Sequence, residues 1–417
     1  MALIKKIYDS VHGFIRFNEL ESALIDSIPF QRLQYIHQLG IAFLVYPGAT
    51  HTRFEHSLGV MELASQIFDR IISKYEPKEA PPDYKYWRQV LRFAALCHDL
   101  GHLPFSHLAE QALLGEGGHE KWSLEIIKSP FLSPIWSTFK ETFPEKDVMG
   151  DIIKLSIGEN KLKELGHPPF SNWEQVICQI ISGDFFGADR IDYLIRDAKC
   201  TGVSYGSFDY HQLIEMLCIL PALDGSGRLE LGIEENGIEA CEALLIARHF
   251  MHRRVYKYPS VKAYAFHLIR FMKLLYSGSR MLQNLEDYLS MTDSEVLCAL
   301  NQAVRDPSHE GHQDAVCLMK RHHRFNAFEV PDTFTEADLQ KLQTQLNIPD
   351  DKTGLELSKN KSSQYAFSFP ALSRHGSLFD ARHCSKLEIP PSSKNWAYID
   401  PEHSSAFQEV LECSKKN

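Results

Sequence analysis

Four short segments concentrate the residue types that perform metal-dependent or hydrolytic chemistry. They read RFEHSLG at 53–59, CHDLGHLPFSH at 97–107, GHEKWS at 118–123 and GADRIDYLIRD at 187–197. Imidazole nitrogen and carboxylate oxygen together suit a divalent ion of intermediate hardness. The first chemistry that these segments suggest is therefore metal-assisted hydrolysis, with histidine and aspartate as ligands.

Two predicted helices position the first two segments. Apolar residues over 54–73 recur at helical spacing, and a second helix is expected from about Tyr86 to Leu100. His56 and His98 both fall on the apolar faces of these helices, where an unpaired polar group is costly. A buried metal ion would satisfy them. A hydrogen-bonded core histidine is the alternative, and the spacing alone leaves both interpretations open.

The rest of the pattern predicts a mostly α fold with a smaller α+β C-terminal region. We place a boundary between a core at 1–290 and a C-terminal region at 291–417. A helical pattern over 19–37 is interrupted at Pro29, and loops are expected at 77–85 and 114–118. Further helices are expected at 147–156, 173–182, 187–197, 208–219, 237–257 and 260–282, and strands at 228–233, 386–389 and 396–399.

Composition restricts the partners of this chain. The formal net charge of −10 argues against a nucleic-acid partner, which usually needs a basic face. Nine scattered cysteines without a CxxC pair indicate reduced thiols and a cytoplasmic location. The sequence shows neither a signal peptide nor an apolar run long enough for a membrane span, so we expect no membrane partner.

The same segments resemble a known family. RFEHSLG, HDLGHLPFSH and the later DRIDY segment, in this order, are similar to the HD phosphohydrolase superfamily. More narrowly, they resemble the deoxynucleoside triphosphate triphosphohydrolases related to the SAM- and HD-domain protein. The opening DSVHGFIRFNELESALIDSIPFQRLQYIHQLG extends the resemblance, which runs from about Lys5 to Tyr258. It implies an HD-domain helical fold, and no SAM module is expected ahead of it.

The resemblance also implies roles for individual residues. The metal ligands would be His56, His98, Asp99 and Asp189, holding Mn, Fe, Zn, Ni or Co, with Mg on the phosphates. A bound ion lowers the pKa of its water toward roughly 7. His119 matches the catalytic histidine, and Glu110 stands where the family has its partnering carboxylate. The implied reaction converts a deoxynucleoside triphosphate to deoxynucleoside and triphosphate.

Substrate binding is carried over in the same way. Phosphate neutralisation needs fixed cations, and a ring packed under the 2′ carbon of the sugar would exclude a 2′-hydroxyl. Tyr193 resembles that ring, and Asp197 resembles the acceptor for the 3′-hydroxyl. The full set of substrate-binding residues is expected to be Gln38, Leu39, Arg53, His102, His107, Arg190, Tyr193, Asp197, Arg248, His252 and Tyr256.

Relatives of this kind form homo-oligomers that nucleotides activate at subunit interfaces, so a dimer or tetramer is expected. Gln34 and Tyr8 depart from the family's regulatory pattern, and a nucleotide effector stays an open question. Three alternatives to the triphosphohydrolase are kept. One is another HD phosphohydrolase, acting on nucleoside monophosphates, cyclic nucleotides or alarmones. Another is a non-catalytic nucleotide-sensing protein. The third, a nuclease, is disfavoured by the acidic charge.

Overall fold

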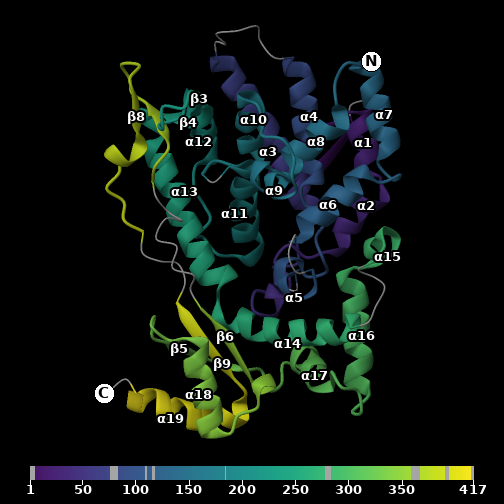
Figure 1. Cartoon of the computed structure of the whole chain (residues 1–417), viewed down its shortest axis with the longest axis vertical. Helices are drawn as coiled ribbons and strands as arrows, with labels where there is room; N and C mark the ends of the chain where they lie inside the picture. Colours follow the sequence, from purple (N-terminus) through teal and green to yellow (C-terminus); the bar gives the residue numbers. More distant parts are fainter. Residues whose placement is uncertain are drawn as a thin grey trace.

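The computed structural model describes residues 5–75, 83–108, 110–114, 118–183, 185–277, 283–357, 367–389 and 394–414. Helices dominate it, which confirms the predicted fold class. A large helical body forms the upper part of Figure 1, and a smaller part with helices and a sheet lies below it. The helix α13 runs down one side of the body and ends at the start of α14, where the two parts meet.

The upper body is built mainly from helices. They are α1 (Glu19–Ile25), α2 (Ile28–Gln31), α3 (Arg53–Lys74), α4 (Tyr84–Cys97), α5 (Glu110–Leu113), α6 (Gly118–Lys128), α7 (Ser133–Thr142), α8 (Val148–Ile157), α9 (Glu159–Glu164), α10 (Asn172–Ser182), α11 (Ala188–Thr201), α12 (Tyr210–Met216) and α13 (Ile238–Met251).

The helices α3 and α4 form the centre of this core. Leu63, Ile67 and Phe93 on their facing sides are buried. Full burial of one such side chain contributes about 1.5–3 kcal/mol. The prediction of a helix over 54–73 is confirmed by α3. The helices α4 and α11 both pack against α3.

Several predicted elements end at other residues than expected. The helix predicted to reach Leu100 ends at Cys97, because the chain turns where Gly101 lies against the α6 backbone. A Cβ on Gly101 would lie 2.1 Å from the carbonyl oxygen of His119. The early helical pattern breaks at Asp26–Ser27, and Pro29 belongs to the first turn of α2, where its missing N–H costs nothing.

Two predicted segments change conformation within their span. Residues 217–219, expected in a helix, begin the strand β3 (Leu217–Pro221), which pairs antiparallel with β4 (Leu229–Glu234). The helix expected to reach 257 ends at Met251 and continues as the π-helical turn His252–Tyr256. Residues 386–389 form irregular backbone, so the predicted strand there is wrong. The loops predicted at 77–85 and 114–118 lie largely outside the described residues.

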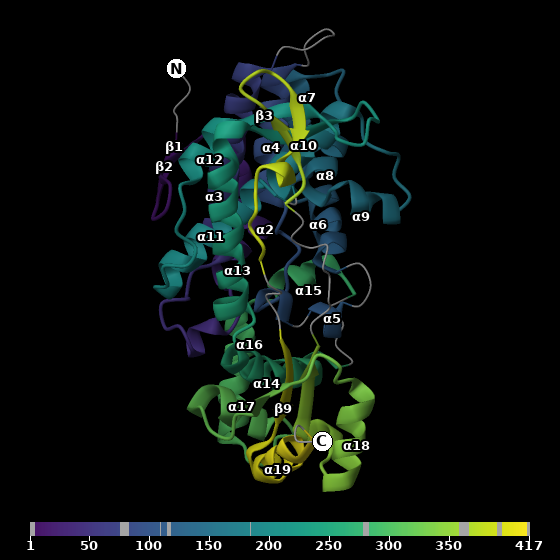
Figure 2. The same ribbon diagram turned by 90° about the vertical axis from the view of Figure 1, so that its left-hand side faces the viewer.

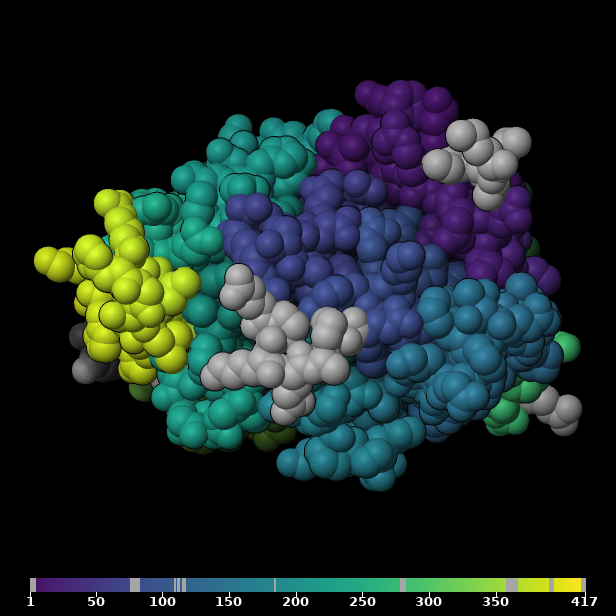
Figure 3. All heavy atoms as spheres, turned by 90° about the horizontal axis from the view of Figure 1, so that it is seen from above, coloured from purple at the N-terminus to yellow at the C-terminus, as the bar shows by residue number. Residues whose placement is uncertain are grey.

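Within the described part of the chain, three small sheets complete the fold. An N-terminal hairpin joins β1 (Lys5–Asp9) and β2 (Gly13–Phe17). A four-stranded sheet has the order β3-β4-β7-β8, in which β7 (Pro370–Leu372) and β8 (Leu378–Asp380) come from the C-terminal part of the chain. Seen from above, these late residues form the yellow mass at one edge of the upper body, beside teal residues (Figure 3).

The lower part combines helices with a three-stranded antiparallel sheet of order β5-β9-β6, as the turned view shows (Figure 2). The predicted strand at 396–399 is confirmed within β9. The elements are α14 (Pro259–Tyr276), α15 (Leu285–Ser290), α16 (Asp293–Arg305), α17 (His312–Lys320), β5 (Asn326–Val330), α18 (Glu336–Leu346), β6 (Thr353–Glu356), β9 (Asn395–Ile399) and α19 (Ser404–Ser414).

No helix among the described residues is long and apolar enough to span a membrane.

Candidate active site

The fold brings the four predicted metal ligands together from three elements. His56 comes from the first turn of α3, His98 and Asp99 follow the end of α4, and Asp189 lies in the first turn of α11. The Nε2 atom of His56 lies 3.0 Å from Oδ1 of Asp189 and 3.7 Å from Oδ2 of Asp99. The Nε2 atom of His98 lies 3.4 Å from Oδ1 of Asp99 and 3.8 Å from Oδ1 of Asp189.

Two of these separations, 3.0 and 3.4 Å, match those between ligands of one ion, and the other two, 3.7 and 3.8 Å, correspond to wider angles at the ion. Donors about 2.1 Å from a common ion lie about 3.0 Å apart at right angles and about 3.4 Å apart at tetrahedral angles. The Nδ1 atom of His98 bonds the carbonyl of Ala95 at 2.7 Å, so the ring proton is on Nδ1 and the lone pair on Nε2. That Nε2 atom is buried and finds no hydrogen-bond partner among the described residues. The residues therefore fit a divalent ion.

The charge balance of the centre depends on Arg53. Its Nη1 donates to Oδ2 of Asp99 at 2.5 Å, and its Nε donates to Oγ of Ser106 at 2.8 Å. Burial raises the pKa of Asp99, but the positive charge of Arg53 outweighs it and holds the pKa well below its usual range. Asp99 is therefore ionised, as a metal ligand must be.

A second cluster surrounds Glu110. Its Oε1 accepts from Nδ1 of His102 at 2.6 Å, and its Oε2 lies 3.1 Å from Nδ1 of both His107 and His119. The rings of His102 and His119 stack at 3.7 Å. Burial first, and then the charge of Arg53, lower the pKa of His102 to about 3. These four side chains could also surround an ion. However, Glu110 already contacts Nδ1 of each of the three histidines, which favours a proton-transfer role for this cluster.

Residues beyond position 283 hold the loop that carries these histidines. Phe105 and Ser106 have positive φ values of 57° and 61°, a conformation that side chains disfavour. Asp293 stabilises it, because its Oδ1 accepts from the Phe105 backbone N–H at 2.6 Å. The hydroxyl of Tyr288 donates to the carbonyl of Gly101 in the same loop. The geometry of the loop therefore depends on α15 and the start of α16.

Basic side chains converge beside the metal ligands. Burial first, and then the charges of Arg248, Lys257 and Arg190, lower the pKa of His252 to about 3. The Nη1 atom of Arg190 donates to the carbonyl of Gly183 at 2.9 Å, and its Nε is buried without a partner among the described residues. These three cations thus place positive charge around His252, although the formal net charge of the chain is −10.

The predicted sugar-binding residues lie on neighbouring elements. The hydroxyl of Tyr256 donates to Oδ2 of Asp197 at 2.8 Å, and the rings of Tyr193 and Tyr256 meet edge to face at 6.0 Å. Gln38 and the adjacent Leu39 are partly buried, and the Oε1 atom of Gln38 is buried without a hydrogen-bond partner among the described residues. Such an atom indicates a missing ligand or water.

Sequence reasoning missed four buried residues around the site. His51 Nε2 bonds Oδ1 of Asp197 at 2.7 Å. Burial disfavours the charged imidazolium, but the bond to Asp197 prevails and raises the pKa of His51 to about 9. Asp192 bonds the candidate metal ligand His56, and His12 and Arg196 bond Asp192. The available signal was the spacing of Asp189, Asp192 and Arg196, which places polar groups on one buried face of α11.

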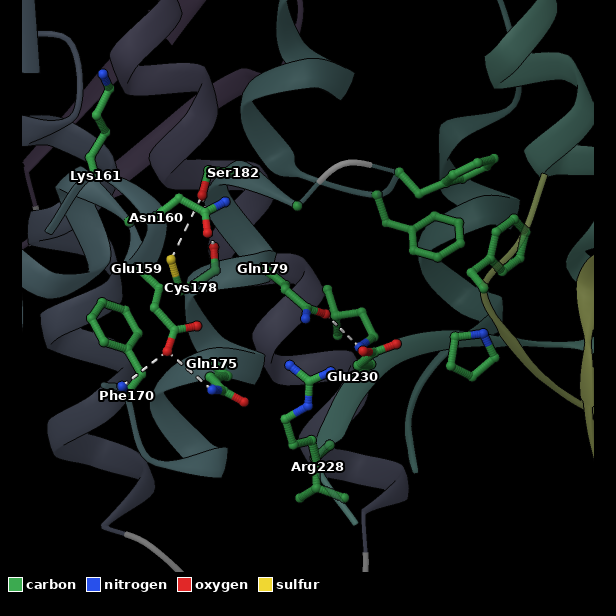
Figure 4. A pocket seen from close by; sticks show the side chains of 18 of the residues that line it. Glu159, Asn160, Lys161, Phe170, Gln175, Cys178, Gln179, Ser182, Arg228 and Glu230 are labelled. Atoms are coloured by element: carbon green, nitrogen blue, oxygen red, sulfur yellow. Dashed lines mark hydrogen bonds between the residues drawn. The ribbon is translucent and has the colours of Figure 1, made fainter. Parts of the chain in front are cut away.

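A pocket whose lining contains none of the candidate metal ligands lies on another part of the helical body. Its volume is about 810 Å³, and residues of α9, α10, β4 and 368–370 line it, together with Arg248. Figure 4 shows Glu159 bonded to Gln175 and to the backbone of Phe170, and Gln179 bonded to the backbone of β4. These polar groups have protein partners, whereas His98 Nε2 has none among the described residues. The chemistry therefore favours the metal centre as the active site.

Comparisons with known proteins agree with this geometry. Residues 53–190 match the HD domain family, and residues 208–352 match the HD associated region. The chain belongs to the HD-domain family. The range 53–190 contains all four candidate metal ligands, and HD domains bind divalent metals.

Relatives extend the likeness. An uncharacterised protein of Methanocaldococcus jannaschii is 36% identical over 62% of this chain and 47% of its own length. The deoxynucleoside triphosphate triphosphohydrolase SAMHD1 of Gallus gallus is 30% identical over 72% of this chain and 52% of its own length. The chain thus spans about half the length of these relatives. The solved structure of a hypothetical protein from Aquifex aeolicus is 30% identical, with a TM-score of 0.77, over 98% of this chain and 100% of that one.

Proposed function

We propose that this protein hydrolyses deoxynucleoside triphosphates to deoxynucleoside and triphosphate in a metal-dependent reaction. The single observation that carries the proposal is the orphaned Nε2 of His98, which faces two carboxylates. The similarity to SAMHD1 supports the choice of substrate. A divalent ion held by His56, His98, Asp99 and Asp189 would polarise the α-phosphate and lower the pKa of a water toward about 7.

The side chains around that centre have separate roles in the proposed reaction. The water oxygen would attack the α-phosphorus as the bond from phosphorus to the 5′ oxygen breaks, and the proton that the water loses would pass to solvent. His119 would donate the proton that the leaving 5′ oxygen needs, as an imidazolium that afterwards regains a proton from solvent. Glu110 holds Nδ1 of His119, so Nε2 of that imidazolium is the nitrogen that donates. The triphosphate leaves whole.

The phosphate chain would be neutralised by Arg53, Arg190 and Arg248, with His102, His107 and His252 as hydrogen-bond partners. Three guanidinium groups exceed what a single phosphate needs, which favours a triphosphate over a monophosphate or a cyclic nucleotide. The depressed pKa of His252 supports the convergence of Arg190 and Arg248, and Arg53 lies beside the proposed ligand Asp99.

The deoxyribose would lie among Gln38, Leu39, Tyr193, Asp197 and Tyr256. The unpaired Oε1 of Gln38 is an acceptor for the 3′-hydroxyl. Asp197 keeps lone pairs beyond those used by His51 and Tyr256, so it is a second acceptor. The ring of Tyr193 would occupy the space that a 2′-hydroxyl needs.

Product analysis tests this proposal. The full chain is incubated with each dNTP and each NTP, with manganese or magnesium, and the products are separated by ion-pair chromatography. We expect deoxynucleoside and intact triphosphate, no products with chelator, and none from Asp99→Ala. The matched control is Asp151→Asn, a buried carboxylate on α8 that bonds Tyr86. Monophosphate with pyrophosphate, or binding without turnover, would refute the triphosphohydrolase and favour another HD phosphohydrolase or a nucleotide sensor.

We also propose that the protein is a homo-oligomer through its N-terminal segment. Tyr8 and Ile28 are 71% and 62% exposed, and the rings of Tyr8 and Phe14 pack on each other at the surface. Light scattering with size-exclusion chromatography tests this proposal, and the double change Tyr8→Ser with Ile28→Ser should shift the mass toward a monomer. A wild-type monomer at micromolar concentration would refute it.

A further inference from the structure

A buried chain of hydrogen bonds connects the N-terminal hairpin with the metal ligand His56. The Nδ1 atom of His56 bonds Oδ2 of Asp192 at 2.8 Å. Oδ1 of the same carboxylate bonds Nε2 of His12 at 2.6 Å, and His12 lies in the turn between β1 and β2. The side chains of His12, Asp192 and His56 are at most 1% exposed. Residues far apart in sequence thus share one carboxylate in the interior.

Every acceptor position of Asp192 is used. Arg196 donates from Nε to Oδ2 at 2.8 Å and from Nη2 to Oδ1 at 3.0 Å, so each oxygen receives two hydrogen bonds. A carboxylate offers about four lone-pair sites. Because arginine only donates and an ionised carboxylate only accepts, Nδ1 of His56 must carry its proton. When a metal ion replaces the Nε2 proton that Asp189 otherwise accepts, the lone pair of His56 is therefore on Nε2, the atom that faces Asp189 and Asp99.

The hairpin turn is itself fixed in place. Oδ1 of Asp9 accepts from the backbone N–H groups of Val11 and His12, each at 2.8 Å. Arg196 also donates from Nη1 to Oδ2 of Asp9 at 2.8 Å. One fully buried guanidinium thus holds both the turn that carries His12 and the carboxylate that His12 contacts. These contacts make the turn part of the support of the metal centre.

We propose that Asp192 and His12 are positioning residues, and that through them the N-terminal hairpin sets the metal affinity of the active site. Groups that orient a metal-binding histidine typically change metal affinity by about 10–100-fold. The inference rests on the proposed function only for the identity of the metal centre. Metal binding alone tests it, so a failure to hydrolyse dNTPs would leave this proposal standing.

The first experiment measures Mn²⁺ affinity of the full, metal-free chain by calorimetry, with the visible spectrum of bound Co²⁺ as a second readout. In Asp192→Asn either orientation of the amide places its NH2 group against Arg196 and also against His12 or His56. We expect a loss of about 10–100-fold in affinity and an altered Co²⁺ spectrum. The control Asp151→Asn removes a different buried carboxylate, which accepts a hydrogen bond from the Tyr86 hydroxyl, and it should bind Mn²⁺ like the wild type.

A second set of variants tests the hairpin even where Asp192→Asn does not fold. His12→Ala removes the donor to Oδ1 of Asp192, and we expect about a tenfold loss of Mn²⁺ affinity. His12→Gln can restore a donor near the Nε2 position and should recover part of it. Lys6→Ala, on the same hairpin and over the ring of Phe14, is the control. Wild-type Mn²⁺ affinity in folded His12→Ala, or the same loss in Lys6→Ala, would overturn the proposal.

Discussion

Arg53 and Asp99 form a buried ion pair in which the Nη1 atom of the arginine lies 2.5 Å from Oδ2 of the aspartate. The same guanidinium donates from Nε to Ser106, so it joins the proposed metal ligand to the histidine-bearing loop. A point charge could not make both bonds, because they leave from different edges of one rigid plane.

Arg53→Lys tests this double contact. The lysine keeps the charge but loses one charge-assisted hydrogen bond of about 1.5–3 kcal/mol, and kcat/KM for dNTP should fall about 10–100-fold. Steady-state kinetics measure this change in kcat/KM. Arg88→Lys is the matched control, because Arg88 makes a similar two-bond contact with Asp69 on the surface. Equal kinetics in the two variants would contradict the role of Arg53.

His119→Gln tests the proton donor. Glutamine keeps polarity but cannot transfer a proton, so kcat should fall about 10²–10⁴-fold, while KM stays within a few-fold. Single-turnover kinetics separate the chemical step from release. The exposed His167 gives the control variant His167→Gln. A His119→Gln enzyme with wild-type kcat would assign the proton to another group.

Tyr193→Ala tests the basis of deoxyribose preference. Removing the ring opens the space that a 2′-hydroxyl needs, and the ratio of kcat/KM for ATP over dATP should rise at least about tenfold, equivalent to about 1.4 kcal/mol. Tyr205→Ala, which removes a surface ring stacked on Phe250, serves as the control. An unchanged ratio would show that sugar selection lies elsewhere.

Gly59→Ala sets two opposing effects against each other. Alanine in a helix interior stabilises the helix by about 1 kcal/mol relative to glycine. At position 59 the new Cβ would lie 2.0 Å from Oδ1 of Asp192 and 2.5 Å from Nη2 of Arg196. Overpacking of this kind costs about 1–3 kcal/mol, so the variant should be destabilised in urea unfolding. Gln66→Ala on the same helix is the control. A more stable Gly59→Ala protein would show that Asp192 can shift freely.

The pKa of His252 predicts a pH dependence of stability. Its folded-state pKa is about 3, below the ordinary 6.5, so the unfolded chain takes up the proton first. Its contribution to stability is therefore present above about pH 6.5 and is lost as the pH falls toward about 3. At pH 5 this loss amounts to at most about 2 kcal/mol. His252→Gln removes this term. The difference in free energy of unfolding between pH 7 and 5 should be smaller in the variant, and an equal difference would contradict the prediction.

Local pattern predicted a large share of this molecule. The helical spacing over 54–73 and the strand at 396–399 were recognisable because burial on one face imposes a period on apolar residues. The four candidate metal ligands and the Glu110–His119 pair were also recognisable, because their residue types and order resemble a known family. Segments whose conformation depends on distant partners were not. Residues 217–219 are a strand only because β4 offers a partner, and the helix before His98 ends early because α6 approaches Gly101.

Residue types in the sequence thus set which side chains are available for chemistry, since they fix what can ligate a metal or transfer a proton. Which nitrogen of His56 and of His98 faces the centre depends instead on contacts made in the folded chain. That choice depends on Ala95 for His98 and on Asp192 for His56, contacts that no local period encodes. The tertiary structure also brings His12 and Asp293, which lie far apart in the chain, to support the same site, because hydrogen bonds form between neighbours in space rather than in sequence.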